Sequence, residues 1–213
     1  MCSRLFIVWG CLVILGGCAS NDEPMPEITH TLTPRVTLPP VNKGFQNLAG
    51  VDKNIPRDWL PPSGVEKKWT AIVIHHSATT NGNAAIFDKW HRENKYWDGI
   101  AYDFVIGNGT NSDDGEVEVT FRWREQLTGA HCKTPNNWAN ENAVGICLVG
   151  DFNQTVPTRR QMQSLVKLVR FLQNRYRIVK SRVYGHKTTP GARVTDCPGK
   201  KFPMDRLKSM LDF

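Results

Sequence analysis

The chain has 213 residues, of which 40% are hydrophobic, which is enough for one ordinary globular domain and a shorter additional segment. Its 27 lysines and arginines outnumber its 20 aspartates and glutamates, and the net charge of +7 suits an anionic partner such as nucleic acid, a membrane surface or a cell-wall polymer. The sequence has no helix-turn-helix signature, RNA-binding motif or basic run interleaved with aromatic residues. We therefore expect no nucleic-acid partner.

The first residues follow the order of a secretory signal. Arg4 precedes an apolar run over residues 5–15, which is shorter than a membrane-spanning helix needs. The run ends in Leu15-Gly16-Gly17-Cys18, which resembles the bacterial lipobox. This resemblance implies cleavage of a signal peptide at 1–17 and a diacylglyceryl group on the sulfur of Cys18. The alternative is an ordinary signal peptide with an incidental cysteine.

The signal predicts that the rest of the chain lies outside the cytoplasm. We therefore expect a lipid-anchored protein. If the cell has an outer membrane, Ala19 after the cysteine favours anchoring there, facing the periplasm. Otherwise we expect the protein on the outer face of the cell membrane. Prolines recur through residues 18–60 and interrupt any helix or central strand. We expect this segment to be a tether or an extended arm.

From residue 61 to residue 213 the hydrophobic pattern becomes regular. Apolar runs and alternation predict strands, and a period of 3.6 residues predicts amphipathic helices. Thr158 and Gln161 match the signature of a capping box at the start of the longest helix. Strands that alternate with helices indicate a single three-layer α/β domain. The predicted strands cover 70–76, 99–107, 116–123, 144–150 and 181–186, the helices cover 83–94, 158–177 and 204–211, and a polar loop covers 133–142.

The first of these strands ends in two adjacent histidines. Its apolar residues, 71–74, indicate a strand that is buried on both faces. Side chains alternate across a strand, so His75 and His76 should point to opposite faces. One can then face a cleft while the other supports it from behind, although a single buried histidine is more often a hydrogen-bonded core residue.

Three cysteines remain after the N-terminal Cys2, Cys11 and Cys18 are set aside: Cys132, Cys147 and Cys197. An odd number in an exported domain requires an explanation, and whether Cys132 and Cys147 form a disulfide stays open. Two histidines and one cysteine are a ligand set for catalytic zinc with an open fourth position, and His75, His186 and Cys197 supply it. His75 and His186 are 111 positions apart, so their spacing alone is a weak argument.

Five segments occur in an order that makes a resemblance specific. Over about residues 68–213 the chain resembles the type 2 N-acetylmuramoyl-L-alanine amidases, a family that includes phage amidase lysozymes and peptidoglycan-recognition proteins. This likeness implies a central mixed β-sheet flanked by helices and one zinc ion per chain. The segments are Ile72-Val73-Ile74-His75-His76-Ser77-Ala78-Thr79, Ala101-Tyr102-Asp103-Phe104-Val105-Ile106, Gly129-Ala130-His131, Asn142-Ala143-Val144-Gly145-Ile146, and Gly185-His186 with Thr195-Asp196-Cys197-Pro198-Gly199.

The resemblance also assigns roles to residues. It places the zinc ligands at His75, His186 and Cys197, whereas the cytoplasmic recycling amidases have an aspartate as third ligand. Tyr102 matches the family tyrosine near the metal, where it would orient water or stabilise an oxyanion, and Thr195 stands where members carry lysine or threonine.

Weaker assignments remain open. His131 and Asn142 belong to motifs near the substrate groove, although a structural role is equally compatible with them. For Tyr102 the alternative is core packing, and for Thr195 it is the cap of a turn. Trp97, Trp123 and Trp138 could stack on a sugar or a peptide, but ordinary burial is the better expectation.

Together these features predict a hydrolase that cleaves the amide bond between N-acetylmuramic acid and L-alanine. We expect peptidoglycan or muropeptides as partners, the membrane as a second partner through the lipid anchor, and a monomer. A non-catalytic peptidoglycan-binding lipoprotein is the alternative. A nucleophilic cysteine–histidine hydrolase is disfavoured, because two histidines and the order of the motifs fit a metal better.

Overall fold

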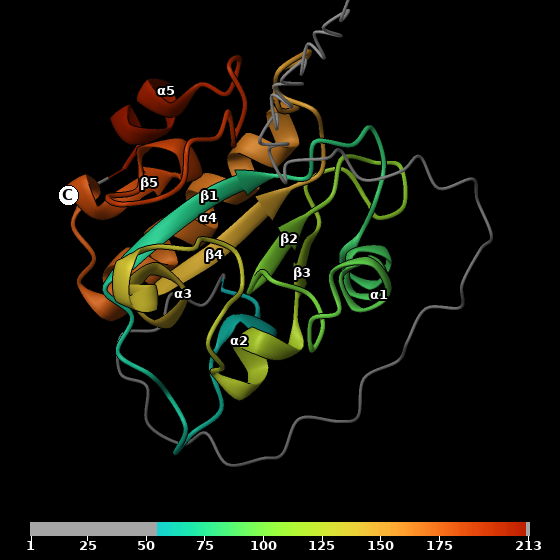
Figure 1. Ribbon diagram of the computed structural model, residues 1–213. Helices are drawn as coiled ribbons and strands as arrows, with labels where there is room; N and C mark the ends of the chain where they lie inside the picture. Colours follow the sequence, from blue (N-terminus) through green and yellow to red (C-terminus); the bar gives the residue numbers. More distant parts are fainter. Residues whose placement is uncertain (1–54, 212–213) are drawn as a thin grey trace, which may run out of the picture.

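A mixed sheet of five strands lies at the centre of the molecule (Figure 1). The computed structural model describes residues 55–211. Across the sheet the order is β3-β2-β4-β1-β5, and all neighbouring pairs are parallel except β2 and β3. The predicted α/β fold with a central mixed sheet is therefore confirmed. The strands are β1 (Ala71–His76), β2 (Phe104–Ile106), β3 (Val117–Val119), β4 (Ala143–Leu148) and β5 (Val183–Gly185).

Helices cover both faces of this sheet. The longest, α4, packs on one face, and α1 and α3 pack on the other. The helices are α1 (Ala84–Lys95), α2 (Phe121–Glu125), α3 (Trp138–Asn142), α4 (Arg159–Tyr176) and α5 (Met204–Ser209), with short 3-10 helices at Arg57–Trp59, Pro135–Asn137, Lys180–Arg182 and His186–Thr188. None of the helices in the described range is long and apolar enough to span a bilayer.

Strand β1 is buried on both faces because each face has its own helical cover. Ile72 and Ile74 belong to the core cluster that includes α4, whereas Ala71 and Val73 pack with α3. The strand pairs with β4 on one side and β5 on the other, so its backbone groups are satisfied along both edges. This alternation continues into the two histidines that end the strand.

The start of α4 has the predicted capping box. The Thr158 hydroxyl accepts a hydrogen bond from the Gln161 backbone N–H, and the Gln161 side chain accepts one from the Thr158 N–H. The Gln161 amide also donates to the carbonyls of Ile106 and Val149. This buried side chain therefore ties the helix to the ends of β2 and β4.

Two predicted strands, 99–107 and 116–123, are shorter than expected. Asp103 binds Gly145 with both its backbone N–H and its carboxylate, so the regular ladder begins only at Phe104. After β3, the Thr120 hydroxyl accepts from the Arg122 N–H and starts helix α2. In both places a side chain forms the hydrogen bonds that a strand would make with its backbone.

The polar segment at 133–142 is helical rather than a loop. It forms a 3-10 turn followed by α3, and Thr134 Oγ1 accepts a hydrogen bond from the Ala139 N–H. Asn140 makes two further hydrogen bonds, to the Cys132 N–H and to Asn137. Asparagine side chains thus hold this segment in a short helix that their low helix propensity does not predict.

The packed unit begins before the predicted boundary at residue 61. Trp59 is buried, and its carbonyl accepts a hydrogen bond from the indole N–H of Trp123. The Cys132–Cys147 disulfide, which the sequence left open, is not formed, and both thiols are buried. The predicted signal peptide, the lipidation site Cys18 and most of the predicted tether lie outside the described residues.

Candidate metal centre

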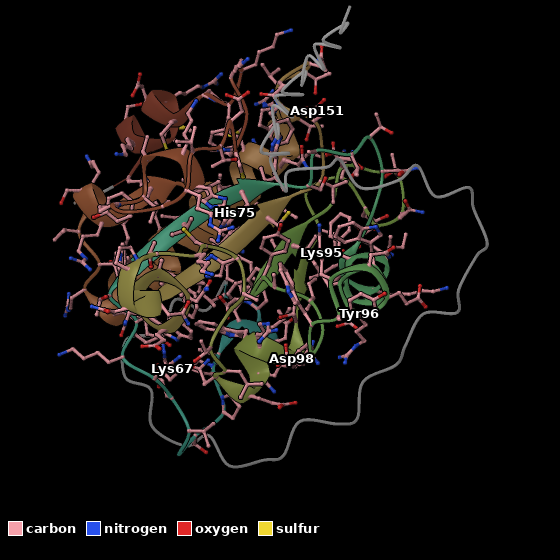
Figure 2. The ribbon with its side chains drawn as sticks, viewed as in Figure 1. Lys67, His75, Lys95, Tyr96, Asp98 and Asp151 are labelled. Atoms are coloured by element: carbon pink, nitrogen blue, oxygen red, sulfur yellow. The ribbon has the colours of Figure 1, made fainter. Side chains whose placement is uncertain are left out.

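His75 and His76 stand at the carboxyl end of β1 and point to opposite faces of the sheet. His75 is paired in register with Cys147 of β4, and Figure 2 shows it toward the end of β1. His76 packs on Phe152, which belongs to the core cluster on the α4 face. The alternation expected for this strand is therefore observed, and His75 faces the side of α1 and α3.

A loop that follows β5 brings two more metal-binding side chains to His75. His186 comes directly after the edge strand β5, which lies beside β1 in the sheet. The Lys187 N–H donates to the Cys197 carbonyl at 2.7 Å, which closes the loop and returns Cys197 to the end of β1. Thr195 Oγ1 accepts from the Cys197 N–H at 3.1 Å and fixes the backbone of the cysteine.

The three predicted ligands converge. One ligand atom from each of His75, His186 and Cys197 lies within 4.8 Å of the others. Cys197 Sγ is 3.5 Å from His75 Nδ1. A tetrahedral zinc ion with Zn–N of about 2.0 Å and Zn–S of about 2.3 Å holds its nitrogen and sulfur ligands about 3.5 Å apart. The donor set and this separation therefore fit zinc, with one coordination position left for water or substrate.

His131 orients His75 through a chain of two hydrogen bonds. His131 Nε2 is 3.2 Å from the Ala143 carbonyl, and His131 Nδ1 is 3.1 Å from His75 Nε2. A carbonyl can only accept, so His131 Nε2 carries the hydrogen, its Nδ1 accepts, and His75 Nε2 donates. This assignment leaves the Nδ1 lone pair of His75 directed at Cys197 and His186, the arrangement that a metal-binding imidazole needs.

The environment keeps both imidazoles neutral. Burial lowers the pKa of His131 to about 3, and burial together with the neighbouring histidines lowers the pKa of His75 well below its ordinary value. Two glycines hold the His131 ring closely, because a Cβ atom on Gly129 or on Gly145 would lie 2.5 Å from its Cδ2. The sequence left substrate binding and a structural role open for His131; the structure places it against His75, 6% exposed and among the residues that line the cavity described below.

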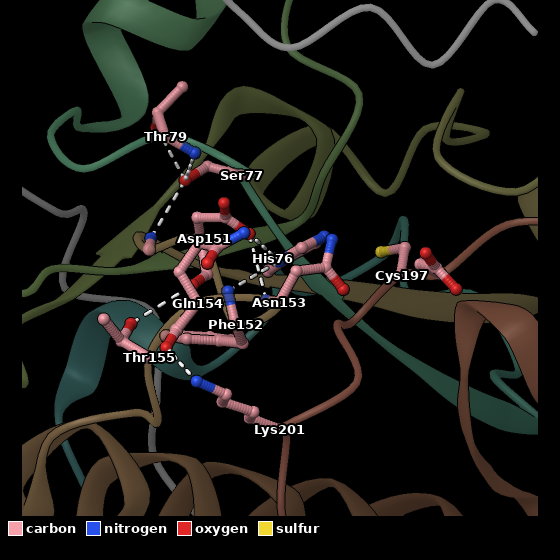
Figure 3. A network of polar contacts seen from close by, with 12 residues as sticks. His76, Ser77, Thr79, Asp151, Phe152, Asn153, Gln154, Thr155, Cys197 and Lys201 are labelled. Atoms are coloured by element: carbon pink, nitrogen blue, oxygen red, sulfur yellow. Dashed lines mark hydrogen bonds and ion pairs between the residues drawn. The ribbon is translucent and has the colours of Figure 1, made fainter.

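His76 fastens the loop after β4 to the same end of β1 (Figure 3). Its Nδ1 accepts a hydrogen bond from the Phe152 N–H at 3.1 Å and lies 4.0 Å from the Asp151 carboxylate. The next residue, Ser77, accepts from the Gly150 N–H through its hydroxyl. This histidine therefore supports the site from the α4 face, as the strand alternation predicted.

Tyr102 lies beside the three ligands. Its ring centroid is 5.2 Å from that of His75, and its side chain lines the cavity above the site. Burial raises the pKa of the Tyr102 hydroxyl well above its ordinary value, and Cys147 and Cys197 raise it further. The hydroxyl therefore stays protonated, and it lies within hydrogen-bonding reach of the buried Cys147 side chain.

Of the remaining predicted residues, some lie at the cavity and others do not. Thr195 lines the cavity, and its hydroxyl caps the turn before Cys197. The structure does not bring Asn142 to the cavity: its amide donates to the Trp138 carbonyl, and its own carbonyl accepts from the Thr70 N–H at the opposite end of β1. Trp123 is fully buried in the core, while the indole of Trp138 donates to the Pro190 carbonyl.

A cavity of about 540 Å³ opens above the three ligands. One wall comes from α1 and the residues just after it, namely Trp90, His91, Lys95 and Trp97, and the loop around Thr195 forms the opposite rim. Sequence reasoning considered only Trp97 of this wall as a binding residue. The predicted helix over 83–94 contains Trp90 and His91, but the hydrophobic period could not show that they border a cavity.

Comparisons with known proteins agree with this geometry. A family model described as N-acetylmuramoyl-L-alanine amidase matches residues 65–200. The amidase LysC from Clostridium intestinale URNW has a similar structure, with a TM-score of 0.56, 33% sequence identity, and coverage of 67% of this chain and 84% of that chain. Bumblebee PGRP-SA has a TM-score of 0.54 at 23% identity, covering 68% of this chain and 83% of its own, and shows likeness of fold alone.

Among curated proteins, peptidoglycan-recognition protein SC2 of Drosophila simulans is 30% identical over 136 residues. The alignment covers 60% of this chain and 66% of that protein. The chain therefore spans just under two thirds of the length of this relative.

Proposed function

The chain belongs to the N-acetylmuramoyl-L-alanine amidase family, and on this basis we propose that it hydrolyses, with zinc, the amide bond between N-acetylmuramic acid and L-alanine in peptidoglycan. The observation that carries the proposal is the convergence of two imidazoles and one thiol, within 4.8 Å of one another, at the floor of a cavity. A closed structural site would fill the fourth position with another side chain, whereas this set leaves it for water and substrate.

His75, His186 and Cys197 would hold the metal. When bound, zinc supplies Lewis-acid chemistry, because it polarises an amide carbonyl and lowers the pKa of water to about 7. His131 keeps the lone pair of His75 Nδ1 aimed at this position, and Thr195 holds the backbone of Cys197.

Tyr102 is the group best placed to act on the substrate itself. The hydroxyl is a protonated donor on a cavity wall, with its ring next to His75. A donor fixed in a partly desolvated site can stabilise the negative charge that develops on the amide oxygen, or it can orient the attacking water. Because its position is set by packing, little reorganisation is needed during the reaction.

The partners follow from this function and from the N-terminal motif. Peptidoglycan or soluble muropeptides would be the substrate, and the similarity to a peptidoglycan-recognition protein supports this class. We also propose that the chain is exported, anchored to a membrane through lipid on Cys18, and monomeric; Cys18 lies outside the described residues.

Mass spectrometry of digested peptidoglycan tests the proposal. Purified full-length protein should release stem peptides that begin with a free L-alanine amino group, and a zinc chelator should abolish their release. Products cleaved at a glycosidic bond or within the stem would contradict the amidase assignment.

A non-catalytic binding module is the second candidate, favoured by the similarity to a recognition protein. This alternative predicts that the protein retains peptidoglycan in a pull-down but releases no stem peptide. The complete ligand set, with Cys197 in place, supports the enzyme over the binder.

A further inference from the structure

The cavity wall formed by α1 continues outward from the metal centre as a row of rings. The ring of His75 lies 5.2 Å from that of Tyr102, which lies 5.8 Å from His91, which in turn stacks on Trp97 at 5.0 Å with an interplanar angle of 14°. Trp97 is 39% exposed and lines the cavity, so part of its indole is accessible to a ligand. A substrate positioned at His75 would therefore extend along this row.

Lys95 gives this wall its positive charge. The Lys95 side chain lines the cavity, and its ammonium lies 5.0 Å from the centre of the Trp90 ring. Burial lowers the pKa of His91 to about 4, so that imidazole is neutral at pH 7. The following residue, Tyr96, is 88% exposed and does not line the cavity.

No acidic side chain in the described range forms an ion pair with Lys95. The one carboxylate among the described residues that line this cavity, Asp196, lies 3.3 Å from the ammonium of Lys200. The indole N–H of Trp90 is buried and has no hydrogen-bond partner among the described residues. The wall thus offers a cation and apolar surface without an anion.

The glycan and the peptide stem of the substrate differ in charge. The N-acetyl sugars of the glycan are uncharged, and the lactyl carboxyl group of muramic acid is consumed in the scissile amide. The peptide stem carries free carboxylates. A lysine over the Trp90 ring in this cavity therefore matches the stem rather than the glycan, because a cation in a partly desolvated cavity attracts an anion more strongly than in water.

We propose that Lys95, together with the indole of Trp97, forms the stem-peptide subsite and binds the first free carboxylate beyond the L-alanine. This inference rests on the proposed amidase function. An extended peptide advances about 3.3–3.6 Å per residue, so the second stem residue lies within one or two of the ring-to-ring steps of 5–6 Å along the wall. The L-alanine would lie near Tyr102 and His91, and the carboxylate would lie near the ammonium.

The test compares two ligands that differ by one charge. Both are N-acetylmuramoyl-L-alanyl-γ-D-glutamyl methylamides, in which the γ-carboxyl group is blocked as it is by the next residue of the stem. In one ligand the α-carboxylate is free, and in the other the same group is an amide. Binding to full-length protein is measured calorimetrically with a zinc chelator present, and kcat/KM is measured without it. We expect wild type to bind the acid about tenfold more tightly than the amide, as one charge-assisted contact on a half-buried side chain allows.

Lys95→Met keeps the length of the side chain and removes its charge. It should bind the acid and the amide equally, with the affinity that wild type has for the amide, which also shows that the variant is folded. Lys89→Met is the matched control, because Lys89 lies on the same helix, pairs with Glu93 and does not line the cavity. This control should keep the tenfold preference.

Two results would overturn the proposal: no preference in wild type, or a preference that survives in Lys95→Met. The outcome is separable from that of the proposed function. A protein that binds with a Lys95-dependent preference but hydrolyses neither ligand contradicts the amidase, whereas hydrolysis without the preference contradicts only the subsite.

Discussion

At the scale of single residues, the hydrogen on the His75 ring decides what the site can bind. His75 Nδ1 faces Cys197, and it can coordinate a metal only if the hydrogen is on Nε2. His131 accepts that hydrogen and is itself fixed by the Ala143 carbonyl. The two hydrogen bonds select one tautomer before any metal arrives, so binding costs no rearrangement of the imidazole.

Replacing His131 should weaken zinc binding without touching a ligand. His131→Leu removes the acceptor, and we expect zinc affinity to fall by about 10- to 100-fold, the usual effect of losing a hydrogen-bond partner of a metal ligand. His131→Asn is the matched control, because its side-chain oxygen can accept at the place of Nδ1, and it should lose less. Competition with a chromophoric chelator measures both affinities; equal losses would contradict the orienting role.

At the scale of elements, the hydrophobic period predicted the helices and strands whose position is determined by packing against the core. The bounds of β1, β4, α1 and α4 agree with the sequence prediction to within two residues, since each element has a long apolar stripe or run. The prediction of a strand through residue 123 was wrong because Thr120 caps a helix there. A single side-chain hydrogen bond can redirect the backbone at such a place, and hydrophobic periodicity does not report it.

The link between β2 and β4 predicts a dependence of stability on pH. Asp103 precedes β2, its carboxylate accepts from the Gly145 N–H at 2.7 Å, and its other oxygen has no partner among the described residues. Burial raises the pKa of Asp103 from an ordinary 3.8 to about 7. Between these values the native state keeps a proton that the unfolded chain has released, so the free energy of unfolding falls as pH rises from about 4 to 7.

Asp103→Asn removes this titration and preserves an acceptor for Gly145. Relative to wild type, the variant should gain about 2–3 kcal/mol between pH 5 and pH 8, because only wild type then has to ionise a buried carboxyl group. Urea unfolding of both proteins at the two pH values gives the difference. If the two proteins change in parallel, the raised pKa is not the cause of the pH dependence.

At the scale of the whole molecule, the order of the strands assembles the site. β5 is the last strand in sequence but lies beside β1, the first, and this neighbourhood joins His186 and Cys197 to His75 across 111 and 122 positions. The sequence spacing of these residues could not predict that they converge, whereas the order of the family motifs along the chain could. The cavity wall formed by α1 was not predicted, because Lys95 belongs to no motif and only the packing of the helix places it at the cavity.

The measurement that tests the account most directly is the zinc content of the purified full-length protein, read together with its release of stem peptide. We expect about one zinc per chain in wild type, loss of both zinc and activity in Cys197→Ser, and retention of both in Cys132→Ser, which alters a buried thiol that lies outside the ligand set. Wild type that is fully active without zinc, or Cys197→Ser that keeps a full equivalent of zinc, would contradict it.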